Sequence, residues 1–375
     1  MPSSQTVLHL SRILFAVLIL MLIACADNGS DANGDGSGNS NNAIVTPPTL
    51  YVANSTAGTL AAFSIDATTG DLTELGTPLA AGSSAEAVAV DADNRFAYVA
   101  NRLANTVTAY SIDQTTGELA SIGSVNVGDG TRPTSVAVDP LGRFVYVANL
   151  VNSTVSIYNI DQTTGALTIV GTPMAVGTNP RNVKVDQTSS FLYVVNMGDN
   201  TISTYSINQS TGTLTEIGTP VATGTNPYSM VIAPNNGFAY VVNQGSNSVS
   251  SFSINQSTGV LTGVGSPVSA SASPWPITVD PLGRFAYVVN NSSNTITAYS
   301  IDQSTGELTS VNTVSTETNP HSVAVDPSGK FVFVPNTSSE TISRYRIDQT
   351  TGALSLLGSD NMGINIGPYA VATTH

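Results

Sequence analysis

The chain has 375 residues, of which only 10% are charged and 6% are aromatic, and its formal net charge is −14. A surface with this negative charge repels the phosphate backbone of nucleic acids, and we therefore expect no nucleic-acid partner. The single cysteine, Cys25, excludes an internal disulfide framework. The many Thr, Ser, Asn and Gly residues favour short strands and tight turns over long helices.

The N-terminus has the pattern of a secretory signal. Arg12 precedes an apolar run, residues 13–23, that is too short to span a bilayer but suits the core of a signal peptide. The run ends in Leu22-Ile23-Ala24-Cys25, which resembles the bacterial lipobox. We therefore expect residues 1–24 to be a lipoprotein signal peptide. Cys25 would then carry a lipid that anchors an exported protein to the bacterial cell envelope, on its periplasmic or surface side.

A polar segment, residues 25–48, follows the cysteine and is rich in Gly, Asn, Asp and Ser. Such a composition does not bury enough apolar surface to fold, so we expect a flexible tether. Its Asp31-x-Asn33-x-Asp35-Gly motif matches the start of a calcium loop. The twelfth position of that motif is Asn42 instead of glutamate, and no flanking helices are expected, so we predict no metal site.

The rest of the chain, residues 49–375, repeats one unit seven times. The phrase Tyr-Val-Ala-Asn or a close variant recurs every 46 to 48 residues. Its copies start at Tyr51, Tyr98, Tyr146, Tyr193, Tyr240, Tyr287 and Phe333. A period near 45 residues with several short strands per unit is typical of a β-propeller blade. We therefore predict an all-β protein, a seven-bladed β-propeller.

Each unit has the pattern of four antiparallel strands. In the copy that begins at Pro133, strand patterns over 133–139, 144–149 and 154–160 are separated by Gly-containing turns and loops, and a fourth begins at 166. The first Tyr-Val-Ala-Asn lacks a leading strand, and the last segment, 368–373, lacks a following one. We therefore expect the C-terminal strand to complete the N-terminal blade, because an open ring would leave exposed strand edges.

Two residue types recur with the repeat. Eleven of the thirteen tyrosines fall at equivalent strand positions, where we expect them to pack between blades. Arg95, Arg143 and Arg284 lie in equivalent turns, and we interpret them as solvated turn residues.

One position of the repeat varies sharply while its neighbours stay constant. It lies two residues before the first Val of the Pro-x-Ser-Val-Ala-Val strand and holds Glu86, Thr134, Arg181, Tyr228, Trp275, His321 and Tyr369. The start of an inner strand crowds the mouth of the central channel, so these side chains are expected to meet in one pocket. The alternative is a tolerant surface filled without selection.

Four of the few cations belong to three consecutive units. Arg102, Arg132 and Lys184 accompany Arg181 there, which favours a ligand that is anionic or carries a carbonyl group. Lys184 fits equally well as a channel residue with its own partner.

The repeats resemble a known family. Pro-x-Gly-Arg-Phe-x-Tyr-Val-x-Asn, paired with Tyr-Ser-Ile-Asp-x-x-Thr-Gly-x-Leu, is similar to the seven-bladed propeller lactonases of the 6-phosphogluconolactonase and carboxymuconate-cyclase type, over about residues 49–374. The resemblance implies opening or closing of a lactone ring at the channel mouth by His, Glu and Arg side chains without a metal. Pro320-His321-Ser322 matches the family's Pro-His segment, whereas Glu86 and Arg181 are assigned by position.

Two functions therefore stay open. In the first, His321 or Glu86 activates water while Arg181, aided by Arg132, holds a carboxylate or an oxyanion. The expected substrate site also includes Arg102, Thr134 and Lys184. The side walls of the site, against a small sugar-like or organic-acid lactone, are expected to be Tyr228, Trp275 and Tyr369. In the second, the propeller is a non-catalytic module that binds a carbohydrate-like ligand or a protein partner. Neither needs a cofactor, and the sequence contains no Walker loop, zinc spacing or dinucleotide fingerprint.

Overall fold

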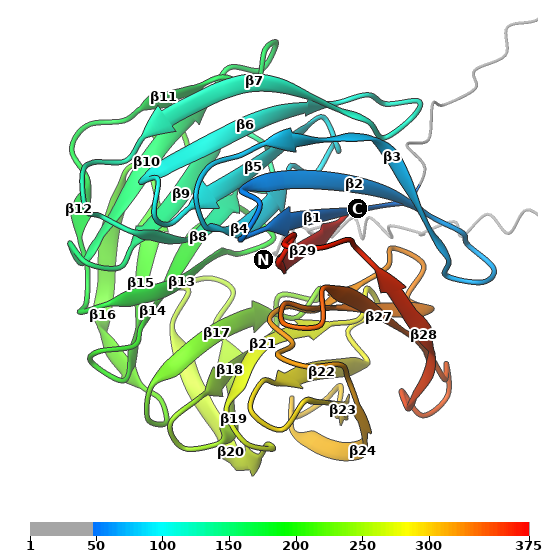
Figure 1. Ribbon diagram of the computed structural model, residues 1–375. Helices are drawn as coiled ribbons and strands as arrows, with labels where there is room; N and C mark the ends of the chain where they lie inside the picture. Colours follow the sequence, from blue (N-terminus) through cyan, green and yellow to red (C-terminus); the bar gives the residue numbers. More distant parts are fainter. Residues whose placement is uncertain (1–47, 375) are drawn as a thin grey trace, which may run out of the picture. The chain divides into compact units, whose positions relative to one another are not determined.

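A computed structural model describes residues 48–374, which form seven antiparallel sheets arranged as blades around a central axis (Figure 1). The prediction of a seven-bladed β-propeller is confirmed. The expected signal peptide, Cys25, the tether up to residue 47 and the calcium-like motif lie outside the described residues. Between residues 48 and 374 there is no helix long and apolar enough to cross a membrane.

Each blade runs from an innermost strand beside the axis to an outer strand at the rim. In blade order, the innermost strands are β29 (Pro368–Thr373), β4 (Ala85–Val90), β8 (Pro133–Val138), β13 (Pro180–Val185), β17 (Pro227–Ile232), β21 (Pro274–Val279) and β25 (Ala324–Val325). The second strands are β1 (Thr49–Asn54), β5 (Phe96–Asn101), β9 (Phe144–Asn149), β14 (Phe191–Asn196), β18 (Phe238–Asn243), β22 (Phe285–Asn290) and β26 (Phe331–Asn336).

The remaining strands complete the blades. The third strands are β2 (Thr59–Ile65), β6 (Thr106–Ile112), β10 (Thr154–Ile160), β15 (Thr201–Ile207), β19 (Ser248–Ile254), β23 (Thr295–Ile301) and β27 (Thr341–Ile347). The outer strands are β3 (Leu72–Ala80), β7 (Leu119–Asn126), β16 (Leu214–Ala222), β20 (Leu261–Ser269), β24 (Leu308–Ser315) and β28 (Leu354–Asn361). In the third blade the outer strand is split into β11 (Leu167–Ile169) and β12 (Met174–Ala175), which both pair with β10.

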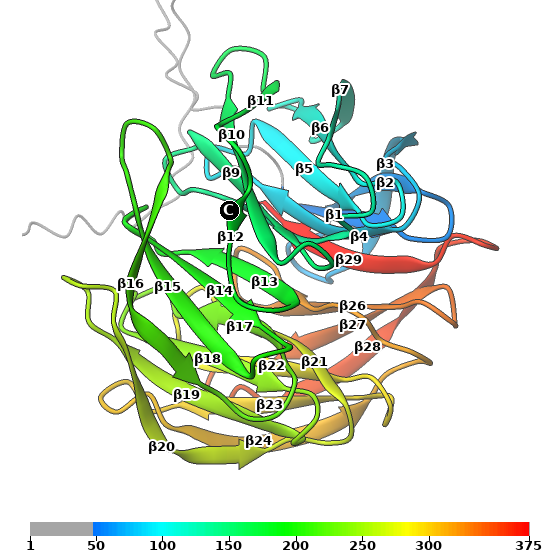
Figure 2. The same cartoon turned by 90° about the vertical axis from the view of Figure 1, so that its left-hand side faces the viewer.

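The ring closes as predicted from the incomplete repeats at the two ends of the domain. β29 is antiparallel to β1, with Val371 opposite Val52, so the last strand of the chain completes the first blade (Figure 2). Both side chains are almost fully buried. The closure therefore covers the edge of β1 and ties the two ends of the described chain together.

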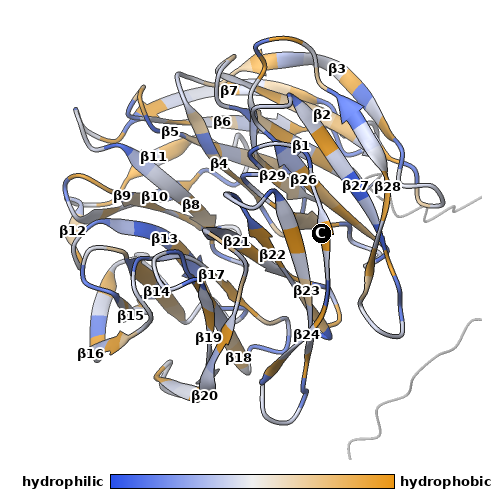
Figure 3. Cartoon of the chain, turned by 60° about the horizontal axis from the view of Figure 1, so that its bottom comes forward, coloured by the Kyte–Doolittle hydropathy of each residue, from blue (hydrophilic) through white to orange (hydrophobic). Residues whose placement is uncertain are grey.

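The core lies between the blades. Residues 48–374 form seven apolar clusters, and each takes its residues from two neighbouring blades, including the last and the first. The second strands are buried along almost their whole length, whereas the outer strands alternate between exposed and half-buried residues. The apolar and polar bands in Figure 3 follow this alternation. The inner three strands of a blade are covered on both faces by its neighbours, so no blade is complete alone.

Tyrosines of the repeat connect neighbouring blades, as expected. The hydroxyl of Tyr146 donates to the Gly212 carbonyl of the next blade at 3.0 Å. Equivalent bonds are made by Tyr51, Tyr98, Tyr193 and Tyr287. At Gly165, φ is +74°, and a Cβ would lie 2.3 Å from the Phe96 ring of the preceding blade. Glycine is therefore required at this contact by both its backbone and the space.

The turn arginines are more than solvated turn residues. Arg143 forms an ion pair with Asp139 at 2.7 Å and donates to both the backbone and side-chain oxygens of Gln209 in the next blade. Arg95 and Arg284 make the same contacts with Gln162 and Gln349. The expectation from sequence was incomplete, because a turn motif does not show which residue of the next blade lies opposite it.

We expect Tyr146→Phe to lower the free energy of unfolding by about 1–2 kcal/mol, because it leaves the buried Gly212 carbonyl without its donor. Tyr240→Phe is the matched control. Tyr240 is equally buried at the equivalent position, yet its hydroxyl has no hydrogen-bond partner among residues 48–374. Denaturant unfolding of both variants is the measurement, and equal losses would contradict the assigned role of the hydroxyl bond.

Candidate active site at the channel mouth

The variable position of the repeat is a β-bulge. In the fourth blade Pro180 pairs with Asn196 and Asn182 with Val195, so Arg181 between them has no partner in the ladder. The same register shift isolates Glu86, Thr134, Tyr228, Trp275 and Tyr369. A bulge releases a residue from sheet pairing and redirects its side chain. Blade packing therefore leaves this one position free to vary.

His321 lies where the innermost strand is irregular. Only Ala324 and Val325 form regular strand there, while Pro320 makes an isolated bridge with Asn336 and the His321 amide donates to the Pro335 carbonyl. The predicted inner strand is thus reduced to two residues in the seventh blade. His321 still occupies the place in the ring that the bulged residues occupy elsewhere.

Glu86 and Arg181 form a buried ion pair. Arg181 Nη1 lies 2.7 Å from Glu86 Oε1, and Arg102 Nε approaches Glu86 Oε2 at 3.4 Å. Glu86 and Arg181 are only 6% and 8% exposed, while the Arg102 side chain is one-third exposed. One carboxylate therefore lies between two guanidinium groups, and this cluster keeps a net positive charge.

A continuous series of ring contacts leads from Arg181 around the mouth. The guanidinium lies 4.3 Å above the Tyr228 ring and also donates to the Tyr228 hydroxyl. Tyr228 stacks on Trp275 with ring centroids 5.0 Å apart, and Trp275 meets His321 edge-on at 4.3 Å. His321 in turn lies 4.1 Å from the Tyr369 ring. Six of the seven variable residues are thus joined in one arc.

The arc borders the central cavity, whose volume is about 670 Å³. Six of the variable residues line this cavity: Glu86, Thr134, Arg181, Tyr228, His321 and Tyr369. Trp275 stands behind them, in contact with two of their rings. Thr134 is buried and donates to the backbone carbonyls of Pro180 and Arg181, so it supports the neighbouring strand. One cavity therefore collects most of the predicted side chains.

The two other predicted arginines do not line this cavity. Arg102 reaches the site only through Glu86. Arg132 is exposed in a loop with a φ of +53°, and its backbone amide donates to Asn105. Lys184 does line the cavity, three residues further along β13 than Arg181. The sequence therefore places the four cations on three consecutive blades. In the structure only Arg181 and Lys184 line the cavity, whereas Arg102 and Arg132 lie outside it.

Burial sets the charge state of the mouth. Desolvation, together with the nearby Arg181 charge, lowers the pKa of His321 to about 3, so its imidazole is neutral at physiological pH. Burial also raises the pKa of Tyr369 well above its usual range, and Tyr228 and Glu86 add to that rise. His321 Nδ1 and Trp275 Nε1 are buried without a hydrogen-bond partner among residues 48–374. Of these two residues, only His321 lines the cavity.

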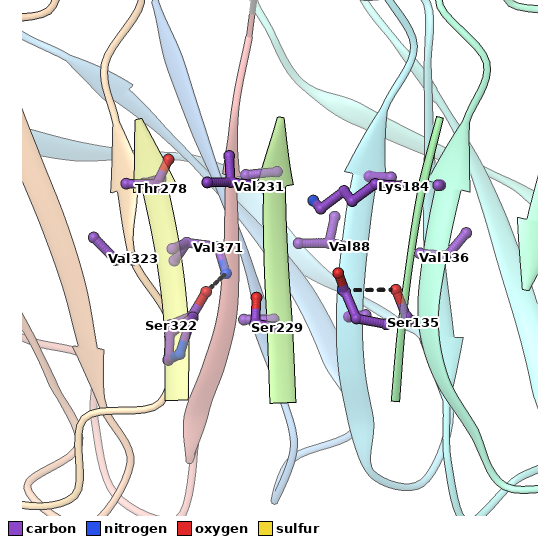
Figure 4. Close-up of a pocket in the computed structure, with 18 of the residues that line it drawn as sticks. Val88, Ser135, Val136, Lys184, Ser229, Val231, Thr278, Ser322, Val323 and Val371 are labelled. Carbon is purple, nitrogen blue, oxygen red and sulfur yellow. Dashed lines mark hydrogen bonds between the residues drawn. The ribbon is translucent and has the colours of Figure 1, made fainter. Parts of the chain in front are cut away.

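The sequence did not single out the third residue of the inner strands. Ser135, Asn182 and Ser322 line the cavity there and link neighbouring blades (Figure 4). Asn182 donates to the Ser135 hydroxyl at 3.2 Å and accepts from the Met230 amide, while Ser322 accepts from the Val371 amide. The only sequence signal was the frequent serine of Pro-x-Ser, which also fits an ordinary strand residue.

The repeats match the family model described as lactonase, 7-bladed beta-propeller, over residues 47–184, 177–275 and 267–365. The chain belongs to this lactonase family. No curated protein matches it significantly. Among solved structures, a candidate 6-phosphogluconolactonase from Bacteroides uniformis is similar at a TM-score of 0.78 and 20% identity, over 88% of this chain and 100% of its own.

Two further structures have the same fold. The periplasmic gluconolactonase of Pseudomonas aeruginosa is 21% identical, with a TM-score of 0.76, over 88% of this lactonase-family chain and 99% of its own. A Lactobacillus plantarum protein is 25% identical at the same TM-score, over 88% and 99% of the two chains. These similarities support the fold, while the mouth residues are argued from their own geometry.

We expect Glu86→Gln to lower the free energy of unfolding by roughly 3 kcal/mol, because Arg181 would keep a buried charge without its counterion. Glu118→Gln, at an exposed position, is the matched control and should change stability by less than about 0.5 kcal/mol. Thermal and denaturant unfolding provide the measurement. Equal stability of the two variants would show that the ion pair contributes nothing.

Proposed function

We propose that this lactonase-family propeller hydrolyses a small lactone at the channel mouth. The observation that carries the proposal is the arc of contacts from Glu86 through Arg181 and Tyr228 to His321, along the border of one cavity. A cation, a hydroxyl donor and a neutral imidazole are the groups that ester hydrolysis needs. Family membership supports the same chemistry.

The residues divide the reaction between them. Neutral His321 accepts a proton from water, and the resulting hydroxide attacks the lactone carbonyl carbon. The Arg181 guanidinium and the Tyr228 hydroxyl stabilise the oxyanion of the tetrahedral intermediate. Cleavage of the ring C–O bond releases an alkoxide, which takes the proton back from His321. Glu86 acts through Arg181 by holding its guanidinium in place.

Between the two predicted bases, the geometry favours His321. Both oxygens of Glu86 face guanidinium groups, so proton uptake there would break two ion pairs. His321 is unprotonated and its Nδ1 has no partner among the described residues. The aromatic rings beside it suit the apolar face of a sugar-like or organic-acid lactone. Two of the similar structures are those of a gluconolactonase and a candidate 6-phosphogluconolactonase.

A non-catalytic binding function is the second candidate. The lowered pKa of His321 and the half-buried ring stack of Tyr228 and Trp275 favour it, because such a surface binds a carbohydrate-like ligand without needing a proton acceptor. Saturable binding of a lactone or sugar without turnover would support this function over hydrolysis.

We also propose that the protein acts outside the cytoplasm, tethered by a lipid on Cys25. The support is the apolar run that ends in Leu22-Ile23-Ala24-Cys25. The periplasmic location of the similar Pseudomonas aeruginosa protein agrees with export. An extracytoplasmic site favours a lactone other than a phosphorylated cytosolic metabolite.

We expect His321→Gln to reduce kcat/KM at least 100-fold on whichever lactone of a sugar and organic-acid panel the protein opens. Because the pKa of His321 is about 3, the acid side of the wild-type pH profile should be flat down to about pH 4. Tyr240→Phe, outside the mouth, is the control and should keep the full rate. No turnover of any lactone, or full turnover by His321→Gln, would contradict the proposal.

We expect Cys25→Ser to remove the lipid and move the protein from the membrane fraction to the soluble fraction of an expressing bacterium. Radiolabelled fatty acid incorporation is the direct measurement. An unlabelled wild-type protein would contradict the proposed anchor, whatever the outcome of the lactone assays.

A further inference from the structure

Lys184 interrupts an otherwise uncharged layer of the channel. It is the fifth residue of β13 and pairs with Tyr193 of the second strand. The equivalent residues of the other blades pair in the same way with their own repeat Tyr or Phe. They are Ala89, Ala137, Val231, Thr278, Ala324 and Ala372. Alanine is thus sufficient for the blade in four of the six, so blade packing does not require a lysine at this position.

The ammonium of Lys184 faces the cavity without a counterion. Figure 4 shows its side chain level with Val231 and Thr278, one layer beyond Val88 and Val136. Among residues 48–374 it has neither an ion pair nor a hydrogen bond. Burial lowers its pKa, which is the expected effect of removing an ammonium from water. Lys184 is half-buried in the channel, and a partly desolvated charge is stabilised when a group of opposite sign joins it.

The nearby carboxylates already have partners. Glu86 faces Arg181 and Arg102 at the mouth, and Asp139 pairs with Arg143. Asp186, two residues after Lys184, accepts from the backbone amides of Ser190 and Phe191 and from the Asn236 side chain. The described protein therefore supplies no free anion for Lys184, and any counterion has to enter the channel from outside.

The surroundings of Lys184 offer further hydrogen bonds to such an anion. The Thr278 hydroxyl lines the cavity in the layer of Lys184, whereas the Ser229 hydroxyl lines it two strand residues nearer the mouth (Figure 4). Neither hydroxyl has a partner among the described residues. Three residues of strand, at about 3.3 Å each, separate Lys184 from Arg181, so roughly 10 Å lies between this layer and the mouth. The two cationic positions are therefore distinct places in one channel.

We propose that Lys184 is the centre of a second binding site, deep in the channel, which takes a small oxyanion such as a carboxylate or a phosphate. The ammonium supplies the opposite charge, and Thr278 supplies a hydroxyl donor in the same layer. The cavity, at about 670 Å³, has room for a small anion in this layer as well as a ligand at the mouth. The site does not depend on lactone hydrolysis.

The chain contains only two lysines, Lys184 and the exposed Lys330, which makes a direct measurement possible. The full chain labelled with ¹³C at lysine Cε should give two lysine signals, each of which reports the protonation of its own amine. Titration with inorganic phosphate, and separately with acetate, at constant ionic strength in chloride should shift the Lys184 signal saturably. The bound anion should also raise the pH at which that signal titrates, because it stabilises the ammonium form.

Lys184→Ala and Lys330→Ala are matched variants that remove the same charge from the channel and from the surface. Isothermal titration should give at least tenfold weaker phosphate or acetate binding in Lys184→Ala, and unchanged binding in Lys330→Ala. Saturation by phosphate alone would identify a phosphorylated ligand, and saturation by acetate would identify a carboxylate. If neither anion shifts the Lys184 signal, or if both lysines shift alike, the proposed site is wrong. Lactone turnover by either variant tests the proposed hydrolysis and does not test the proposed anion site.

Discussion

Each blade has an apolar surface on both faces of its sheet, and only a neighbouring blade on either side covers those faces. The seven clusters between blades show that this need is met all the way around. The pairing of β29 with β1 closes the ring, and the stability of every blade depends on this closure. An open ring would expose two apolar blade faces to water. The repeat in the sequence follows from this packing of blade on blade, because seven equivalent contacts between blades require seven similar sets of side chains.

The same constraint decides where chemistry is possible. A residue in the middle of a blade packs against a neighbouring blade, and this packing restricts which side chain is possible there, as it does for the buried tyrosines. The bulged residue at the start of an inner strand has no ladder partner and faces the cavity, so its side chain costs the blade little to change. Diversity at that position is thus a consequence of backbone geometry. The acid, the base and the imidazole meet because six such bulges and the irregular start of the seventh inner strand surround one axis.

Sequence alone was sufficient for the fold and for the convergence of six variable residues on one cavity. Period, turn residues and orphan end strands predicted seven blades and their closure, because each of these signals is local or repeats. The pairing of Glu86 with two arginines, the order of the ring stack and the exposure of Arg132 were not predictable, because they depend on how neighbouring blades rotate against one another. The expectation for Arg143 was incomplete for the same reason, since Gln209 belongs to another repeat.

Charge distribution gives the channel a character unlike that of the whole protein. The chain carries a net charge of −14, yet the ion pairs at the mouth leave a positive excess and Lys184 adds another cation deeper in the cavity. An acidic exterior repels anions at long range, with a reach that salt limits to about 10 Å, while a neutral lactone approaches without hindrance. Ring opening turns that neutral ester into a carboxylate. The proposed reaction therefore creates its negative charge where the local field is positive, which stabilises the transition state more than the uncharged substrate.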